Sequence, residues 1–218
     1  MPDDRSELLR RFVVSSTTLR PVPLVPEVRL HLTDDVTALW QRTEAELGGP
    51  ALDPPFWASA WAGGQAVARF LLDEPGRVAG RTLLDLGSGS GLCAIAAALA
   101  GASVTAADVD EVAMAAIGVN AAANAVRVRA VRRDLLDDEP PAVDVVVAGD
   151  VCYERSMSER ALAWLRLARD QGTDVLLGDP GRAYLPSAGL TPVAHYPMAA
   201  DLDLESPRMT RASVFTLP

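Results

Sequence analysis

Three glycines follow a run of apolar residues in the segment Leu83–Leu92, which reads Leu-Leu-Asp-Leu-Gly-Ser-Gly-Ser-Gly-Leu. Gly87, Gly89 and Gly91 let the backbone approach a ligand at a place where a Cβ atom would collide with it. A dinucleotide-binding fingerprint requires the pattern GxGxxG, but the sixth position counted from Gly87 is Leu92. The spacing therefore argues against a nicotinamide dinucleotide and favours another nucleoside ligand.

Carboxylates accompany this glycine loop in a regular order. Asp85 stands just before the loop, where it would repel a pyrophosphate but would attract the ammonium and sulfonium groups of S-adenosylmethionine (SAM). Asp108 ends the next predicted strand and can accept hydrogen bonds from two ribose hydroxyls, although helix capping is an alternative role. Asp134 follows a third strand and can accept from an adenine amino group while Leu135 packs on the ring; a solvated loop acid is the alternative for Asp134.

Alternating strands and helices position these residues. Segments such as Val143–Ala148 are apolar almost throughout, as expected for strands covered by helices on both faces of a parallel sheet. The last two strands are separated by polar sequence without a convincing helix, so we expect them to form an antiparallel pair. The predicted strands are Thr82–Leu86, Val104–Ala107, Val128–Arg132, Val143–Ala148, Val175–Gly178, Leu190–Tyr196 and Ala212–Leu217. The predicted helices among them are Leu92–Ala100, Glu111–Asn124 with Asp110 as its N-cap, and Ser158–Gln171.

The first fifty residues have a different pattern. A short helix is predicted over Glu7–Phe12, an extended Pro-rich stretch over Leu19–Pro26, a strand over Val28–Leu32 and a helix over Asp34–Leu47. A further helix follows Pro54 and Pro55 and ends near Leu72. We therefore predict an N-terminal arm and helix over residues 1–50 and one α/β domain over residues 51–218.

Composition excludes several classes of chemistry. All 20 basic residues are arginine, so neither a P-loop lysine nor a pyridoxal-binding lysine is present. Two histidines and two cysteines without metal-ligand spacing make a metal site improbable, and Cys93, Cys152, His31 and His195 are interpreted as structural. The net charge of −9 disfavours nucleic acid as a partner, and no membrane segment is apparent. We expect a cytoplasmic protein with reduced thiols.

With these motifs in hand, the sequence resembles the class I SAM-dependent methyltransferases, which have a seven-stranded Rossmann-like fold. The resemblance covers roughly residues 50–218 and extends to a narrower group that methylates protein lysines. It is carried by Pro55-Phe-Trp-Ala-Ser-Ala-Trp61, by the loop from Asp85 to Gly91, and by Asp150-Val-Cys-Tyr153, which has the D-x-x-Y form of that group. Asn120-Ala-Ala-Ala-Asn124 and Gly178–Pro186 are most similar to the electron transfer flavoprotein β-subunit lysine methyltransferase family.

The resemblance implies a fold, a cofactor and a set of roles. The fold is α/β, a mostly parallel sheet in the order 3-2-1-4-5-7-6 with an antiparallel last strand and helices on both faces. SAM is the implied cofactor, and the flavoprotein β-subunit is the implied protein substrate. The implied cofactor contacts are Trp61, Gly87, Gly89, Asp108, Leu135 and Gly149. Asp150 and Tyr153 would line the acceptor entrance, where we expect Asp150 to bind the lysine ammonium and Tyr153 to provide an aromatic wall and a hydrogen-bonding partner.

Several alternatives remain open at this point. Trp61 and Trp57 could be packing aromatics, and Asp150 could cap the end of a buried strand. The glycine loop and the asparagine-rich helix also resemble the ribosomal protein L11 methyltransferases, and small-molecule N-methyltransferases of the nicotinamide type share the same core. A nicotinamide-dependent oxidoreductase and a non-catalytic binding scaffold are the alternatives from other classes.

Overall fold

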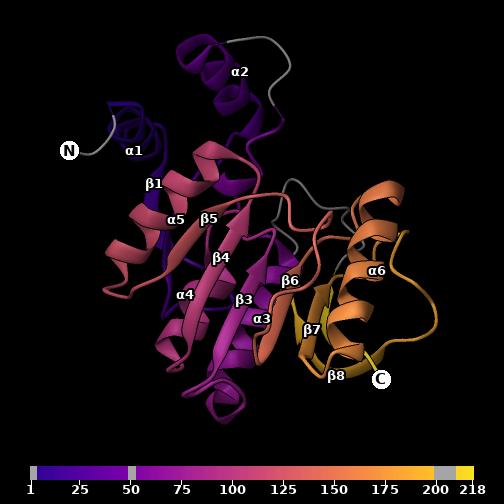
Figure 1. Ribbon diagram of the computed structural model, residues 1–218. Helices are drawn as coiled ribbons and strands as arrows, with labels where there is room; N and C mark the ends of the chain where they lie inside the picture. The colour runs from indigo at the N-terminus through magenta and orange to yellow at the C-terminus, as the bar shows by residue number, and fades with distance from the viewer. Residues whose placement is uncertain (1–3, 49–52, 199–209) are drawn as a thin grey trace.

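A seven-stranded sheet forms the centre of the computed structural model, which describes residues 4–48, 53–198 and 210–218. Its strand order is β5-β4-β3-β6-β7-β9-β8 (Figure 1). The first five strands of this order run parallel, and β9 is antiparallel to both of its neighbours, which confirms the predicted topology. The strands are β3 (Thr82–Leu86), β4 (Ser103–Asp108), β5 (Arg129–Arg132), β6 (Val145–Gly149), β7 (Asp174–Asp179), β8 (Thr191–Pro197) and β9 (Arg211–Thr216).

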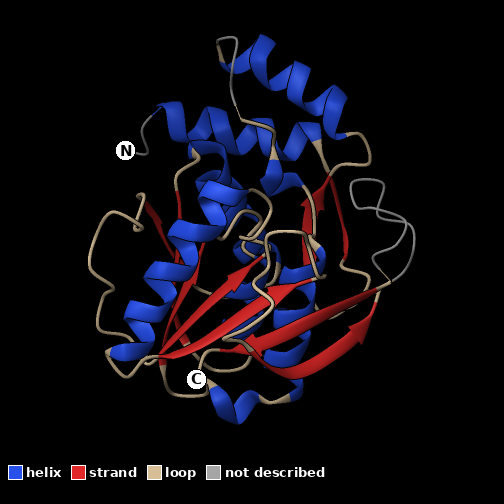
Figure 2. Cartoon of the chain, turned by 90° about the vertical axis from the view of Figure 1, so that its right-hand side faces the viewer, coloured by secondary structure: helices blue, strands red, loops and turns tan. Residues whose placement is uncertain are grey.

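Helices cover both faces of this sheet, as predicted. On one face, α3 (Ala62–Asp73), α4 (Leu92–Leu99) and α5 (Glu111–Ala123) share an apolar cluster with the strands, and on the other face α6 (Arg155–Asp170) does so. Figure 2 shows helices in front of and behind the strands. The side chain of Asp110 accepts a hydrogen bond from the Val112 backbone N–H, so the predicted N-cap of α5 is confirmed. No described helix is long and apolar enough to cross a membrane.

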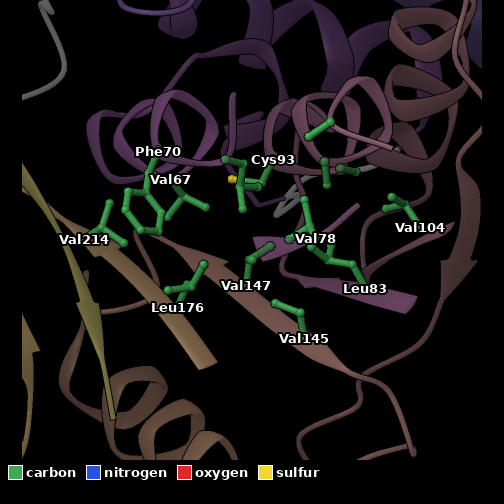
Figure 3. Packing of buried hydrophobic residues seen from close by; sticks show 14 of the residues in the cluster. Val67, Phe70, Val78, Leu83, Cys93, Val104, Val145, Val147, Leu176 and Val214 are labelled. Atoms are coloured by element: carbon green, nitrogen blue, oxygen red, sulfur yellow. The ribbon is translucent and has the colours of Figure 1, made fainter. Parts of the chain in front are cut away.

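The larger core cluster lies between α3, α4 and the sheet. Val67 and Phe70 of α3 pack on Val147, Leu176 and Val214 of three neighbouring strands (Figure 3). All five side chains are at most 5% exposed. Burial of an aliphatic or aromatic side chain of this size stabilises a fold by about 1.5–3 kcal/mol. This cluster therefore fixes α3, whose first turn reaches the carboxyl ends of β6 and β7.

That first turn of α3 meets the strand ends backbone against backbone. A Cβ atom at Gly63 would lie 2.3 Å from the carbonyl oxygen of Gly178, and one at Gly149 would lie 2.7 Å from the Cα of Gly64. Neither position can hold a side chain without moving the helix or the strand. We call these four residues, Gly63, Gly64, Gly149 and Gly178, the glycine seam.

The start of α3 differs from the sequence prediction. Pro54 and Pro55 precede a short 3-10 helix, η1 (Phe56–Ala58), and the α-helix begins only at Ala62. The chain is extended at Trp61, with φ −65° and ψ 148°, so one continuous helix from the prolines is not possible. A second 3-10 turn, η2 (Pro75–Arg77), follows α3.

The N-terminal elements are α1 (Asp4–Ser16), the antiparallel pair β1 (Thr18–Pro21) and β2 (Arg29–Leu32), and α2 (Val36–Leu47). Of these, α1 and β2 pack on α5. The side chain of Asn124 accepts from the Arg29 backbone N–H and donates to the Arg29 carbonyl, while Asn120 accepts from the His31 N–H and donates to the carbonyl of Ser90. Asn120 of α5 thus joins β2 to the glycine loop, and Asn124, the C-cap residue of α5, holds β2 at a second point. The boundary at residue 50 stays a prediction.

Candidate functional site

A cavity of about 530 Å³ opens at the carboxyl ends of β3, β4 and β6. Pockets of 300–1,000 Å³ at this edge of an open α/β sheet commonly bind small molecules. Every site residue predicted from the sequence lines it: Trp61, Asp85, Gly87, Gly89, Asp108, Asp134, Leu135, Gly149, Asp150 and Tyr153. The ten residues predicted from the sequence therefore lie around one cavity, while the individual role of each stays a prediction.

The glycine loop forms the floor between β3 and α4. Gly87, Gly89 and Gly91 have φ values of 66°, 52° and 85°, in the left-handed region that side-chain-bearing residues rarely adopt. The Ser88 N–H donates to the carbonyl of Ala107, which ties the loop to β4. This conformation presents backbone to the cavity and leaves room for a nucleoside.

Asp85 is buried beneath the loop, with 2% of its surface exposed. One carboxylate oxygen accepts from the Ser88 hydroxyl at 2.6 Å and from the Ala94 N–H at 3.0 Å. Burial raises the pKa of Asp85 from 3.8 to about 6, against the opposing effect of these two hydrogen bonds, and the charge of Asp108 adds to the rise. A cationic ligand would favour the ionised form of this carboxyl group.

Asp108 ends β4 and faces the same loop. Its two oxygens accept from the Gly89 N–H at 2.8 Å and from the Asp110 N–H at 3.0 Å. Asp110, and not Asp108, caps α5. A carboxylate has about four lone-pair sites, so Asp108 retains acceptors for a ligand after these two bonds.

Asp134 and Leu135 form the wall beyond β5. Burial opposes ionisation of Asp134, but hydrogen bonds from Arg160 and from the Leu136 N–H outweigh it and lower the pKa of this carboxyl group. Leu135 is half-buried and packs on the cluster beneath α6. Arg160 is a partner of Asp134 that sequence reasoning did not identify.

An aromatic row borders the mouth of the cavity. The Trp61 and Phe56 rings meet edge to face at 5.9 Å between centroids, and Phe56 meets Tyr153 at 5.6 Å. Tyr153 is 48% exposed, and burial together with the charges of Glu154, Asp53 and Asp108 raises the pKa of its hydroxyl. An apolar wall beside carboxylates suits the long chain and charged head of a lysine. The role of Phe56 was not predicted. Trp57 is buried in an apolar cluster and also lines the cavity, so its packing role stays a prediction.

Asp150 has different partners from those expected. Its carboxylate is 9% exposed and accepts from the N–H groups of Gly63 and Gly64 at 2.9 and 2.6 Å, and from the Arg182 guanidinium at 2.5 Å. The Trp61 side chain does not cap α3, so Asp150 supplies that cap from a distant part of the chain. The predicted contact with an acceptor ammonium would have to be made beside these donors.

Arg182 is the functional candidate that the sequence reasoning missed. It lies after β7 in the stretch Gly178–Pro186, lines the cavity, and contacts both Asp150 and Asp179. The sequence resemblance covers this stretch, but no local pattern indicates a partner for the arginine, because the pairing spans 32 residues. Only the meeting of β6 and β7 at one sheet edge places these charges together.

The two cysteines and His31 are buried, whereas His195 is exposed on β8, and the structural interpretation of these four residues stays a prediction. Burial raises the pKa of both Cys93 and Cys152, so neither is activated as a nucleophile. His31 contacts the Thr17 hydroxyl and His195 contacts the Ser213 hydroxyl. In the described part of the chain, no group of three or more His, Cys, Asp or Glu side chains could hold a metal ion.

Known proteins share the fold and part of the sequence of this chain. The family model described as ribosomal protein L11 methyltransferase matches residues 70–151, the part of the chain that contains the glycine loop. The magnesium protoporphyrin IX methyltransferase of Synechocystis PCC 6803 with bound SAM superposes with a TM-score of 0.55 at 15% identity, over 84% of this chain and 93% of that one. A T. thermophilus 16S rRNA N2 G1207 methyltransferase gives a TM-score of 0.53 at 18% identity, over 73% and 43% of the two chains. These structures show a methyltransferase fold.

Full-length relatives identify the family. An electron transfer flavoprotein beta subunit lysine methyltransferase of Xenopus laevis is 37% identical over 217 residues, covering 95% of this chain and 86% of the relative. The human protein of the same description is 36% identical over 197 residues, covering 88% and 73%. Both alignments extend well beyond the core that the L11 model matches. The chain belongs to the electron transfer flavoprotein beta subunit lysine methyltransferase family.

Proposed function

We propose that this protein uses SAM to methylate lysine side chains of the β subunit of an electron transfer flavoprotein. The observation that carries the proposal is the 37% identity over nearly the whole chain to a relative named for that substrate. The D-x-x-Y segment of the chain supports it, because Asp150 and Tyr153 both line the cavity. A cytoplasmic location is part of the same proposal.

The residues that line the cavity fit the cofactor in their chemistry and in the space they leave. Gly87 and Gly89 present bare backbone, Asp108 offers acceptors for ribose hydroxyls, and Leu135 offers an apolar surface for adenine. Asp85 supplies negative charge beneath the loop for a cationic ligand. When bound, SAM supplies a methyl group on a cationic sulfur, which an amine can accept in a single displacement.

Alignment is the main task of the protein in such a displacement. The nitrogen–carbon bond forms as the carbon–sulfur bond breaks, and the electron pair of that bond stays on sulfur. The acceptor lysine must first lose a proton to solvent, because an ammonium has no lone pair. In the proposal, Asp53 and Glu154 attract the cation at the mouth, and Tyr153 and Phe56 align its chain.

Mass spectrometry of the purified flavoprotein tests the proposal. The intact β subunit is incubated with SAM and either the wild-type enzyme or the variant Asp108→Ala, and peptides are then mapped. We expect increments of one methyl group on lysines with the wild-type enzyme and loss of most of this signal with the variant. Labelled SAM in a lysate of the host organism provides the second arm. Label in a ribosomal protein or only in small molecules would reject the flavoprotein as substrate.

A further inference from the structure

Asp150 adopts an unusual backbone conformation at the end of β6. Its φ of 62° lies in the left-handed region, and among the described non-glycine residues only Ala125 shares this property. Such a conformation is unfavourable for a residue with a side chain and persists only where its surroundings enforce it. The Asp150 N–H donates to the carbonyl of Gly178, and its carboxylate holds the first turn of α3. The bend thus directs this side chain into the glycine seam.

Arg182 secures the bend from the neighbouring strand. Its guanidinium is 12% exposed and bridges Asp150 to Asp179, which is fully buried at the end of β7. Asp179 in turn accepts from the N–H groups of Gly181 and Arg182, both at 2.7 Å. Burial raises the pKa of Asp179, and the arginine opposes that rise. The arginine therefore sits between two carboxylates that little water can reach.

Among the described residues, two thiols and a carboxyl group are the other titratable groups nearest to this pair. Cys93 of α4 and Cys152 beside Asp150 both have raised thiol pKa values, mainly through burial and partly through the charge of Asp150. Asp85 of β3 lies beneath the loop and has its own partners. The exposed carboxylates, Asp53 and Glu154, lie at the mouth around Tyr153. The cavity thus has an acidic mouth and an inner wall where a guanidinium offsets the charge of Asp150.

This arrangement separates two requirements of lysine methylation. A carboxylate near the amine stabilises the ammonium form and raises its pKa, whereas a nearby cation lowers it. Attraction is useful at the mouth, but the reacting nitrogen must be neutral. We propose that Arg182 is a positioning residue, which holds Asp150 against α3 and offsets its charge so that the acceptor lysine can lose its proton. The inference rests on the proposed lysine methylation.

The single-turnover methylation rate at saturating acceptor, measured from pH 6.5 to 10, tests this role. Arg182→Gln leaves two carboxylates without their cation, so the rising limb of the pH profile should move to higher pH by about one unit. The rate at pH 7.5 should then fall about tenfold and recover near pH 10. Arg182→Lys keeps the charge and should keep the wild-type limb.

The control variant is Arg69→Gln. Arg69 is 18% exposed and also bridges two carboxylates, those of Glu27 and Asp73, but it does not line the cavity. Its removal should lower the melting temperature and leave the limb in place. Asp150→Asn should shift the rising limb in the direction opposite to Arg182→Gln. It removes negative charge beside Arg182, so the limb should move to lower pH. This second variant tests the inference even if Arg182→Gln does not fold.

Distinct results would overturn the two proposals. Three results would show that Arg182 has only a structural role. The rising limb of the pH–rate profile could stay in place in Arg182→Gln, could move equally in Arg69→Gln, or could move to higher pH in Asp150→Asn. Failure of the wild-type enzyme to methylate any flavoprotein lysine at any pH would overturn the proposed function, and the inference with it. Methylation by the wild-type enzyme with an unmoved limb would overturn the inference alone.

Discussion

The buried carboxyl group of Asp85 lowers the free energy of unfolding in a pH-dependent way, which can be measured on the protein without cofactor. Its pKa rises from 3.8 to about 6 on folding, because burial disfavours the ionised form. The folded state therefore binds the proton more tightly, and its stability falls as pH rises between about 4 and 6. A rise of about two units corresponds to roughly 3 kcal/mol at neutral pH.

The variant Asp85→Asn removes this titration and keeps the shape of the side chain. Both hydrogen bonds, from Ser88 and from Ala94, reach the same carboxylate oxygen, so one amide oxygen can accept both. The stability of the wild type should fall between pH 4 and pH 7, so we expect the free energy of unfolding of the variant, relative to wild type, to increase by about 2–2.5 kcal/mol over this range.

Urea unfolding at a series of pH values measures this difference. Asp170→Asn, at an exposed position at the end of α6, is the control and should show little change across the range. A constant difference between Asp85→Asn and wild type across pH 4–7 would refute the reasoning, since it would show that Asp85 is ionised equally in both states.

Further variants test three parts of the structure: the glycine seam, the mouth of the cavity, and the contact between Asn124 and β2. Gly178→Ala places a Cβ 2.1 Å from the carbonyl oxygen of Gly63, so its free energy of unfolding should fall by about 3 kcal/mol. The control Gly118→Ala, where a Cβ would meet no atom within 4 Å, should be neutral or stabilising. Tyr153→Ala should raise the KM for the protein acceptor about tenfold, and Tyr153→Phe should raise it less, because the ring provides most of the contact. Asn124→Ala should cost about 1–2 kcal/mol in thermal unfolding, because it breaks both bonds to β2.

The parallel core was predictable because its signals are local. Leu83–Leu92 combines an apolar strand, a glycine loop and an apolar helix, and the structure places each within a residue of its expected bounds. The cavity follows from this order, since the carboxyl ends of parallel strands lie at one edge of the sheet. The sequence therefore sufficed to gather the ten predicted residues at one cavity.

The unpredicted features depend on contacts between distant segments. Whether Asp150 faces an incoming ligand or the first turn of α3 depends on how closely Gly63 approaches Gly178, which no local pattern encodes. Arg182 meets Asp150 only because β6 and β7 are neighbours. The break before α3 was also missed, because the prolines indicate a helix start but not the extended residue at Trp61.

Calorimetric titration with SAM tests the central claim most directly, namely that the carboxylate-flanked cavity binds a cationic sulfonium nucleoside. We expect saturable binding of SAM to the wild-type protein, at least tenfold weaker binding to Asp108→Ala at a temperature where this variant is still folded, and no binding of NADH. Absence of heat with SAM on folded protein, or equal affinity in the wild type and the variant, would contradict the assignment of this cavity.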